Sequence, residues 1–170
     1  MNTPIADSYW VEPGRFLAGE YPAAEAATDA AQKVALFLAA GVTSFVDLTE
    51  EDEDLRPYRD LLGESGRYRR APIVDNGCPT ADGLRETLAY LDVELANGWV
   101  VYLHCWGGHG RTGLVVGCWL VRHGAEGEEA LTRITELRRG LPDVLWQPSP
   151  QTPEQCTMVL DWEHLDASGE

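Results

Sequence analysis

The chain has few basic residues and no long apolar run. Lys and Arg total 13 of the 170 residues, against 28 Asp and Glu, and the formal net charge is −15. Nucleic acids and anionic membrane surfaces are bound by basic patches, so we expect neither as a partner. No apolar stretch approaches the ~18 residues needed to cross a bilayer. We therefore expect a protein that is not inserted in a membrane and whose protein partners offer basic surfaces.

Targeting signals are also lacking. The first residues, MNTPIADSYW, have neither the basic start nor the apolar block of a signal peptide. Neither end carries a lipidation motif. We expect a cytoplasmic location.

Cysteine and histidine are scarce, with four of each. The cysteines are scattered, with no C-x2-C pair, and the histidines are not spaced with them as zinc ligands are. Four cysteines are too few for a disulfide scaffold of this length. We expect reduced thiols and no metal, with Cys118 and Cys156 buried as small apolar side chains.

The chain contains no internal repeat and no low-complexity linker, and its length suits one domain over residues 1–170. The patterns predict a short helix and turn at 56–66. They predict strands at 14–22, 42–50, 68–75 and 99–105, and helices at 23–41, 80–98, 111–124, 126–140 and 152–165. Such alternation predicts an α/β fold with a central, mostly parallel mixed sheet and helices on both faces. The unbroken apolar run WVVYLHC is typical of a strand at the centre of the sheet.

The segment HCWGGHGRTG, residues 104–113, joins that strand to the following helix. Ligands of open α/β sheets bind at the carboxyl ends of strands. Glycines allow the backbone to curl so that successive N–H groups point inward, and the helix N-terminus and Arg111 add positive charge. The segment therefore predicts a phosphate-binding loop in an otherwise acidic chain.

Cys105 stands at the base of this loop. The same dipoles and Arg111 favour its thiolate, which would face a bound phosphate as a nucleophile. The Thr112 hydroxyl is expected to hydrogen-bond the sulfur, and His104 is expected to orient the loop. The alternative is a glycine-rich turn with an incidental cysteine, which the length of the full motif disfavours.

The motif resembles the signature of a known family. HCWGGHGRTG matches H-C-x-x-G-x-G-R-[ST]-G, the signature of the cysteine-dependent protein tyrosine phosphatases, and the chain is most similar to their dual-specificity-like bacterial branch. The resemblance implies a tyrosine-phosphatase-like fold, a phosphocysteine intermediate on Cys105 and no metal or organic cofactor. It implies that the phosphate is bound by Trp106, Gly107, Gly108, His109, Gly110 and Arg111.

Two further segments carry the resemblance. PIVDNGCPT is similar to the family's I-x-D-x-x-x-P stretch, which implies that Asp75 is the general acid; a plain turn aspartate is the alternative. PSPQTPEQCTMVLDW is similar to its Q-T-x-x-Q stretch. This implies that Gln151 positions the hydrolytic water and that Gln155 supports it, the alternative being ordinary glutamines at a helix start.

The sequence leaves the substrate class and part of the function undecided. Phosphotyrosine, with phosphoserine and phosphothreonine, is the first. His109, where many family members are aliphatic, makes an inositol phosphate or phosphoinositide the second, although a histidine pointing to solvent is the favoured reading. A phosphate-binding module without turnover, and a thiol oxidoreductase or sulfurtransferase, are less favoured. The candidate walls of the substrate pocket are Arg56, Tyr58 and Trp146. Cys78 is a candidate for a protective disulfide with Cys105. The sequence does not indicate the oligomeric state.

Overall fold

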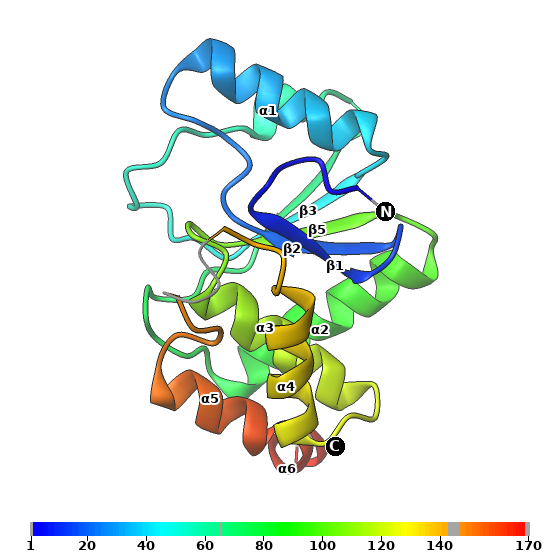
Figure 1. Cartoon of the computed structure of the whole chain (residues 1–170), viewed down its shortest axis with the longest axis vertical. Helices are drawn as coiled ribbons and strands as arrows, with labels where there is room; N and C mark the ends of the chain where they lie inside the picture. Colours follow the sequence, from blue (N-terminus) through cyan, green and yellow to red (C-terminus); the bar gives the residue numbers. More distant parts are fainter. Residues whose placement is uncertain (1, 65, 143–146, 169–170) are drawn as a thin grey trace.

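A five-stranded sheet forms the centre of the protein, for which the computed structural model describes residues 2–64, 66–142 and 147–168. The strands are β1 (Ser8–Glu12), β2 (Phe16–Gly19), β3 (Ser44–Asp47), β4 (Arg67–Arg70) and β5 (Val101–His104). Their order is β1-β2-β5-β3-β4 (Figure 1). Only the β1–β2 pairing is antiparallel among the described strands. The predicted mostly parallel mixed sheet is confirmed.

Strand β5 lies at the centre of the sheet, as its apolar run predicts, and all four of its residues are buried. It pairs in parallel with β2 and β3, so that His104 stands opposite both Gly19 and Asp47. The carboxyl ends of β2, β5 and β3 therefore lie side by side at one edge of the sheet. The next residue is Cys105, which places the loop at the edge where α/β sheets bind ligands.

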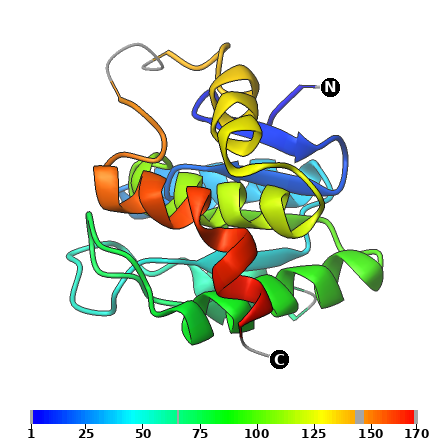
Figure 2. The ribbon, with the colours of Figure 1, turned by 90° about the horizontal axis from the view of Figure 1, so that it is seen from below.

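Helices cover both faces of the sheet, as predicted (Figures 1 and 2). Helix α1 (Ala27–Ala39) and the short 3-10 helix Arg59–Leu62 pack on one face. The other face is covered by α2 (Ala81–Ala96), α3 (Gly110–Arg122), α4 (Gly127–Leu137), α5 (Pro153–Leu160) and α6 (Trp162–Ala167). Figure 2 shows α3 between α2 and α4.

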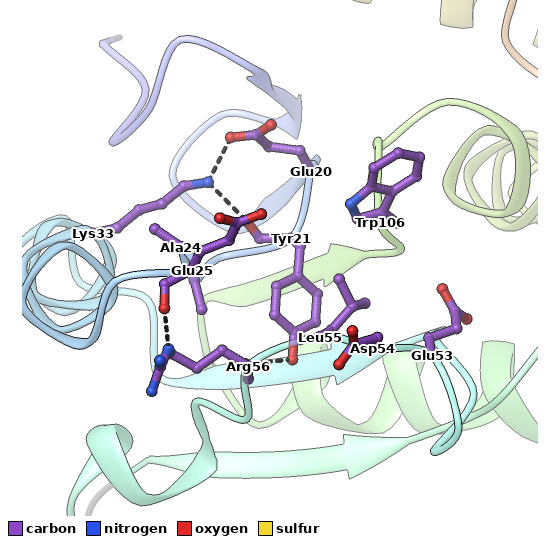
Figure 3. A pocket seen from close by; sticks show the side chains of 11 residues that line it. Glu20, Tyr21, Ala24, Glu25, Lys33, Glu53, Asp54, Leu55, Arg56 and Trp106 are labelled. Atoms are coloured by element: carbon purple, nitrogen blue, oxygen red, sulfur yellow. Dashed lines mark hydrogen bonds and ion pairs between the residues drawn. The ribbon is translucent and has the colours of Figure 1, made fainter.

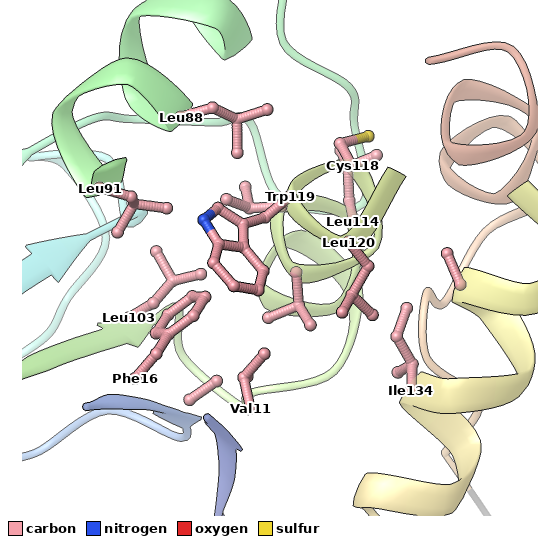
Figure 4. Close-up of a cluster of buried hydrophobic side chains, with 14 of the residues drawn as sticks. Val11, Phe16, Leu88, Leu91, Leu103, Leu114, Cys118, Trp119, Leu120 and Ile134 are labelled. Atoms are coloured by element: carbon pink, nitrogen blue, oxygen red, sulfur yellow. The ribbon is translucent and has the colours of Figure 1, made fainter. Parts of the chain in front are cut away.

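Helix α3 is the most deeply buried of the described helices, since every residue from Gly110 to Val121 is buried. A helix that is apolar on all sides is typical of such a position. The Trp119 ring meets the Phe16 ring edge to face, with centroids 5.1 Å apart, among the leucines of α2 and β5 (Figure 4). This packing fixes the helix whose first turn forms part of the phosphate loop.

Three elements differ from the sequence expectation. Strand β1 was not expected; it is a short edge strand with an irregular register between Trp10 and Glu12. The helix expected at 152–165 is divided at Asp161, so that Trp162 turns into the core. The first helix begins at Ala27 rather than Ala23, and Ala23 lies in the buried cluster under α1. Within the described ranges, no helix has both the length and the apolar character required to span a membrane.

Candidate active site

The loop after β5 forms one wall of a cavity of about 320 Å³ at the carboxyl edge of the sheet. The structure brings together most of the residues singled out in the sequence. The lining consists of Asp7, Glu20, Asp75, Cys105, Trp106, Gly107, His109, Gly110, Arg111, Gln147 and Gln151. Of the candidate site residues, Gly108 and Thr112 do not line it.

Cys105 is buried at the base of this loop. Its sulfur accepts a hydrogen bond from the backbone N–H of Gly108, at 3.3 Å between Sγ and N. An inward-pointing amide at this position is what the glycine pattern predicted, and it is a donor suited to a thiolate. The sulfur and the inward backbone therefore share one concave site.

Gly108 is required by the backbone. Its φ is +74°, and a Cβ at this position would lie 2.4 Å from the carbonyl carbon of Gly19. We expect Gly108→Ala to displace the loop and to lower the free energy of unfolding by about 1–3 kcal/mol, because both the φ and the contact are incompatible with a side chain. Urea unfolding measures this loss. Gly140→Ala is the matched control, since a Cβ there meets nothing within 4 Å; equal stability of the two variants would contradict the assignment.

The Arg111 side chain is 2% exposed, and its guanidinium is held by several hydrogen bonds. Its guanidinium donates to both carboxylate oxygens of Glu53, at 2.5 and 3.1 Å, and to the Ile73 carbonyl oxygen at 3.1 Å. Burial lowers the pKa of Arg111, but the bonds to Glu53 and the nearby Cys105 charge outweigh burial, so the net pKa is raised. The guanidinium is thus a fixed cation beside the sulfur.

Glu53 is a site residue that the sequence analysis missed. Burial raises the pKa of Glu53, but the bonds from Arg111 and from the Glu50 amide outweigh it and hold the pKa below its ordinary value. The only sequence signal was its place in an acidic run after the strand β3, which reads equally well as a solvated loop.

Asp75 reaches the same guanidinium from the loop after β4. Its Oδ1 lies 3.1 Å from Nη2 of Arg111, and its other carboxylate oxygen accepts from the Asn76 side chain at 2.9 Å. The Asp75 side chain is 56% exposed at the cavity mouth. A carboxyl group placed here can face the leaving oxygen of a bound phosphate ester.

The two glutamines of the α5 segment have different positions. Gln155 is buried; its Oε1 accepts from the Gln151 and Thr152 amides at 3.0 and 3.2 Å, and its Nε2 donates to the Gly77 carbonyl at 2.9 Å. Gln155 thereby ties the start of α5 to the loop that carries Asp75. The exposed Gln151 lines the cavity itself.

The expectations for Thr112 and His104 have different outcomes. The Thr112 hydroxyl is buried and makes no hydrogen bond within the part of the chain that the structure describes, so the expected contact with the Cys105 sulfur is not formed. His104 is buried, and its ring contacts the Tyr58 hydroxyl at 2.6 Å and the Cys105 carbonyl oxygen at 3.1 Å, which suits an orienting role. Burial is the main cause that lowers the His104 pKa.

His109 does not point to solvent, contrary to the favoured expectation. Its Nδ1 lies 2.7 Å from Nη2 of Arg138, and its ring lies over Gly107, where a Cβ would come 2.9 Å from Nε2. The ring is therefore part of the cavity wall. Arg138, the C-cap residue of α4, had no signal in the sequence analysis.

A second cavity of about 480 Å³ adjoins the first and shares Glu20 and Trp106 with it (Figure 3). Trp106 is 64% exposed at the rim. Figure 3 shows Lys33 engaged with Glu20 and with the Tyr21 carbonyl. Acidic side chains dominate its charged lining, in keeping with the acidic surface expected from composition.

None of the remaining candidates within the described ranges lines the first cavity. Arg56 lines the second cavity, Tyr58 is buried behind His104, and Trp146 is outside the described residues. Cys78 is exposed, and desolvation together with Glu154 raises the pKa of its thiol. A raised pKa disfavours the thiolate needed for disulfide exchange, so the structure gives the Cys78–Cys105 disulfide no support.

Comparison with solved structures places the fold among phosphatases. Tk-PTP in its active form is 26% identical, covers 93% of this chain and 97% of its own, and superposes with a TM-score of 0.75. Kinase associated phosphatase is 20% identical over 98% of this chain and 99% of its own, with a TM-score of 0.78. The second likeness concerns the fold alone.

Two curated relatives are named as tyrosine phosphatases of invertebrate iridescent viruses. "Putative tyrosine phosphatase 067L" of Invertebrate iridescent virus 3 is 41% identical over 88 residues, which are 48% of this chain and 35% of that protein. "Putative tyrosine phosphatase 197R" of Invertebrate iridescent virus 6 is 29% identical over 150 residues, 84% of this chain and 48% of that protein. The chain thus spans between about a third and a half of the length of these relatives.

A family model covers nearly the whole described fold. The model of the Swiss Army Knife protein PTP-SAK, a DSP-PTPase phosphatase domain, matches residues 6–158. These residues include the sheet, the loop with Cys105 and Arg111, and the segment of Gln151 and Gln155. The chain therefore belongs to the PTP-SAK family of dual-specificity-type protein tyrosine phosphatase domains.

Proposed function

We propose that this chain is a cysteine-dependent phosphomonoesterase that works through a phosphocysteine intermediate, with phosphotyrosine in proteins as its preferred substrate. The observation that carries the proposal is the cavity in which the Cys105 sulfur, the Arg111 guanidinium and the Asp75 carboxyl meet. Phosphoserine and phosphothreonine are further substrates of the same chemistry. The proposal places the protein in the cytoplasm, with residues 1–170 as one phosphatase domain.

The first step transfers the phosphoryl group to sulfur. The phosphate binds on the inward amides and on Arg111, and takes the place beside Nη2 that Asp75 occupies here. The Cys105 thiolate forms the P–S bond while the bond from phosphorus to the ester oxygen breaks. Protonated Asp75 gives its proton to that oxygen, so the alcohol or phenol leaves neutral.

The second step returns the thiolate. A water held by Gln151 loses a proton to the Asp75 carboxylate, its oxygen attacks phosphorus, and the P–S bond breaks to release inorganic phosphate. Gln155 keeps the two catalytic segments at a fixed separation through its bonds to Gln151 and Gly77. Positioning and fixed positive charge supply most of the acceleration.

The charges around the cavity favour a substrate with one phosphate. Asp7 and Glu20 line the cavity wall, and Glu53 stands behind Arg111. A second phosphate on an inositol ring would meet these carboxylates. An aromatic phosphate ester places a neutral ring there, and Trp106 at the rim offers it an apolar surface.

Phosphate release with a chelator present tests the substrate class. A phosphotyrosine peptide, a phosphothreonine peptide and soluble inositol phosphates are compared at equal concentration. Faster release from the phosphotyrosine peptide is expected. Release mainly from inositol phosphates would move the function to the alternative substrate class with the same chemistry, and binding without release would favour a phosphate-binding module.

Asp75→Asn tests the general acid. The variant keeps the shape but has no proton to give, so kcat/KM on a phosphotyrosine peptide should fall by about 10²- to 10⁴-fold. The loss should be much smaller on p-nitrophenyl phosphate, because its leaving group departs without protonation. Asp82→Asn is the matched control, since Asp82 is an exposed carboxylate on α2. Full activity of Asp75→Asn on the peptide would remove Asp75 from this role.

A further inference from the structure

In the part of the chain that the structure describes, the buried Arg138 lies behind the phosphate loop without a carboxylate partner. Arg138 follows the last residue of α4 and its side chain is 2% exposed. Among the described residues its guanidinium donates to the Gln147 carbonyl oxygen at 3.0 Å and to Nδ1 of His109 at 2.7 Å, while its Nε has no partner. Arginine is rarely buried without an acidic partner, because the desolvation of the charge is not offset. The position therefore calls for a reason other than stability.

The contact with His109 fixes the chemistry of the imidazole. A guanidinium only donates hydrogen bonds, so the nitrogen that faces it must be the acceptor. Nδ1 of His109 consequently carries no proton, and in the neutral ring the proton is on Nε2. Adding a proton to Nδ1 would break this bond and place two cations 2.7 Å apart.

The backbone of His109 is fixed at the same time. Its carbonyl oxygen accepts from the Ser149 hydroxyl at 2.8 Å and from the Gly113 amide at 3.0 Å. His109 is the N-cap of α3, and the ring edge that carries Nε2 lies against Gly107 at the cavity wall. Ser149 and Arg138, both outside the loop, thus hold the backbone and the ring of this loop residue.

We propose that Arg138 is a positioning residue that holds His109 as an oriented, neutral Nε2–H imidazole in the wall of the phosphate cavity. The histidine then does not add a second positive charge beside Arg111. The Arg138–His109 pair makes the loop suited to substrates with one phosphate rather than to polyphosphorylated ones. This inference rests on the proposed function for its consequence in substrate choice, but its structural part does not.

Nitrogen-15 NMR of the histidine side chains tests the structural part. The His109 signals are assigned by their loss in His109→Leu. The wild-type protein at neutral pH should show Nε2 protonated and Nδ1 bare, and Arg138→Met should convert His109 to mixed tautomers or to the doubly protonated ring. A doubly protonated or Nδ1–H ring in the wild type would overturn the proposal. Because this readout needs no turnover, it stands even if the proposed function fails.

A double-mutant cycle tests the functional part. A hydrogen bond to a charged group contributes about 1.5–3 kcal/mol, so Arg138→Met should lower kcat/KM on a phosphotyrosine peptide by about 10- to 100-fold. Arg138→Lys should recover much of this, because lysine also donates to Nδ1. In the His109→Leu background, Arg138→Met should cost little more. An equal cost in both backgrounds would mean that Arg138 acts as a structural residue only.

Two controls separate positioning from folding. Arg139→Met removes the same charge from the neighbouring exposed residue and should leave activity and stability unchanged. Thermal unfolding identifies any Arg138 variant that has lost its fold. In that case His109→Lys decides, since it places at the cavity wall the positive charge that the neutral ring withholds: an unchanged preference between the phosphotyrosine peptide and inositol phosphates would contradict the proposal.

Discussion

Cys105→Ser is expected to abolish phosphate release while leaving phosphate binding intact. Serine has nearly the same shape, but its hydroxyl keeps its proton at neutral pH and is a poor nucleophile in this mechanism. The Gly108 amide and the Arg111 guanidinium, which bind the phosphate, are unchanged. We expect kcat to fall by about 10⁴-fold or more, a range seen when a nucleophile is removed.

Two measurements check this result together. Phosphate release from a phosphotyrosine peptide gives the loss of turnover, and titration calorimetry with the same peptide gives the retained binding. Cys78→Ser is the matched control, because Cys78 is an exposed thiol on the loop after Asp75 and takes no part in the mechanism. Wild-type turnover in Cys105→Ser would exclude a phosphocysteine intermediate. Loss of both turnover and binding, with the fold intact, would mean that the sulfur itself is needed to hold the phosphate.

The strand, loop and helix around Cys105 could be predicted from sequence because their signals are local. A buried strand reads as an apolar run, and a tight anion-binding turn needs glycines, so WVVYLHC and the segment after it place the loop without any long-range knowledge. Gly108 confirms this reasoning, since its positive φ and its contact with Gly19 both require glycine. The general-acid role of Asp75 was inferred from a resemblance and stays a prediction; the structure places its carboxylate 3.1 Å from Nη2 of Arg111.

The partners of the loop could not be predicted because they depend on how distant elements pack. Glu53 looks like one more acid in a solvated run until β3 places it beside Arg111. Arg138 looks like an ordinary helix-end arginine until α4 packs against α3. Thr112 shows the reverse case: it is near Cys105 in sequence, but its buried hydroxyl forms no hydrogen bond with the sulfur.

Arg111→Lys is expected to lower kcat/KM by about 10³-fold, although the charge is kept. A planar guanidinium bonds two oxygens at once, whereas an ammonium group acts as a single point charge. The loss of two charge-assisted bonds, at about 2 kcal/mol each, corresponds to about that factor. The rate of phosphate release from a phosphotyrosine peptide gives the measurement, and the loss should appear in both kcat and KM.

Arg122→Lys supplies the matched control for this effect. Arg122 is on the same helix and also bonds a carboxylate through two nitrogens, at 2.8 and 2.5 Å from Asp166, but it lies at the far end of α3. Both substitutions remove a bidentate ion pair, so both should lower stability, and only Arg111→Lys should lower activity.

Glu53→Gln then separates the binding of phosphate by Arg111 from the ion pair that Arg111 forms with Glu53. The amide keeps one acceptor for the guanidinium but loses the charge that helps to hold it, so an intermediate loss of activity is expected. If Arg111→Lys lost no more activity than Arg122→Lys, the guanidinium would be a support for Glu53 rather than the ligand of the phosphate. If Glu53→Gln matched the wild type while Arg111→Lys lost about 10³-fold, the loop and Ile73 alone would suffice to aim the guanidinium at its substrate.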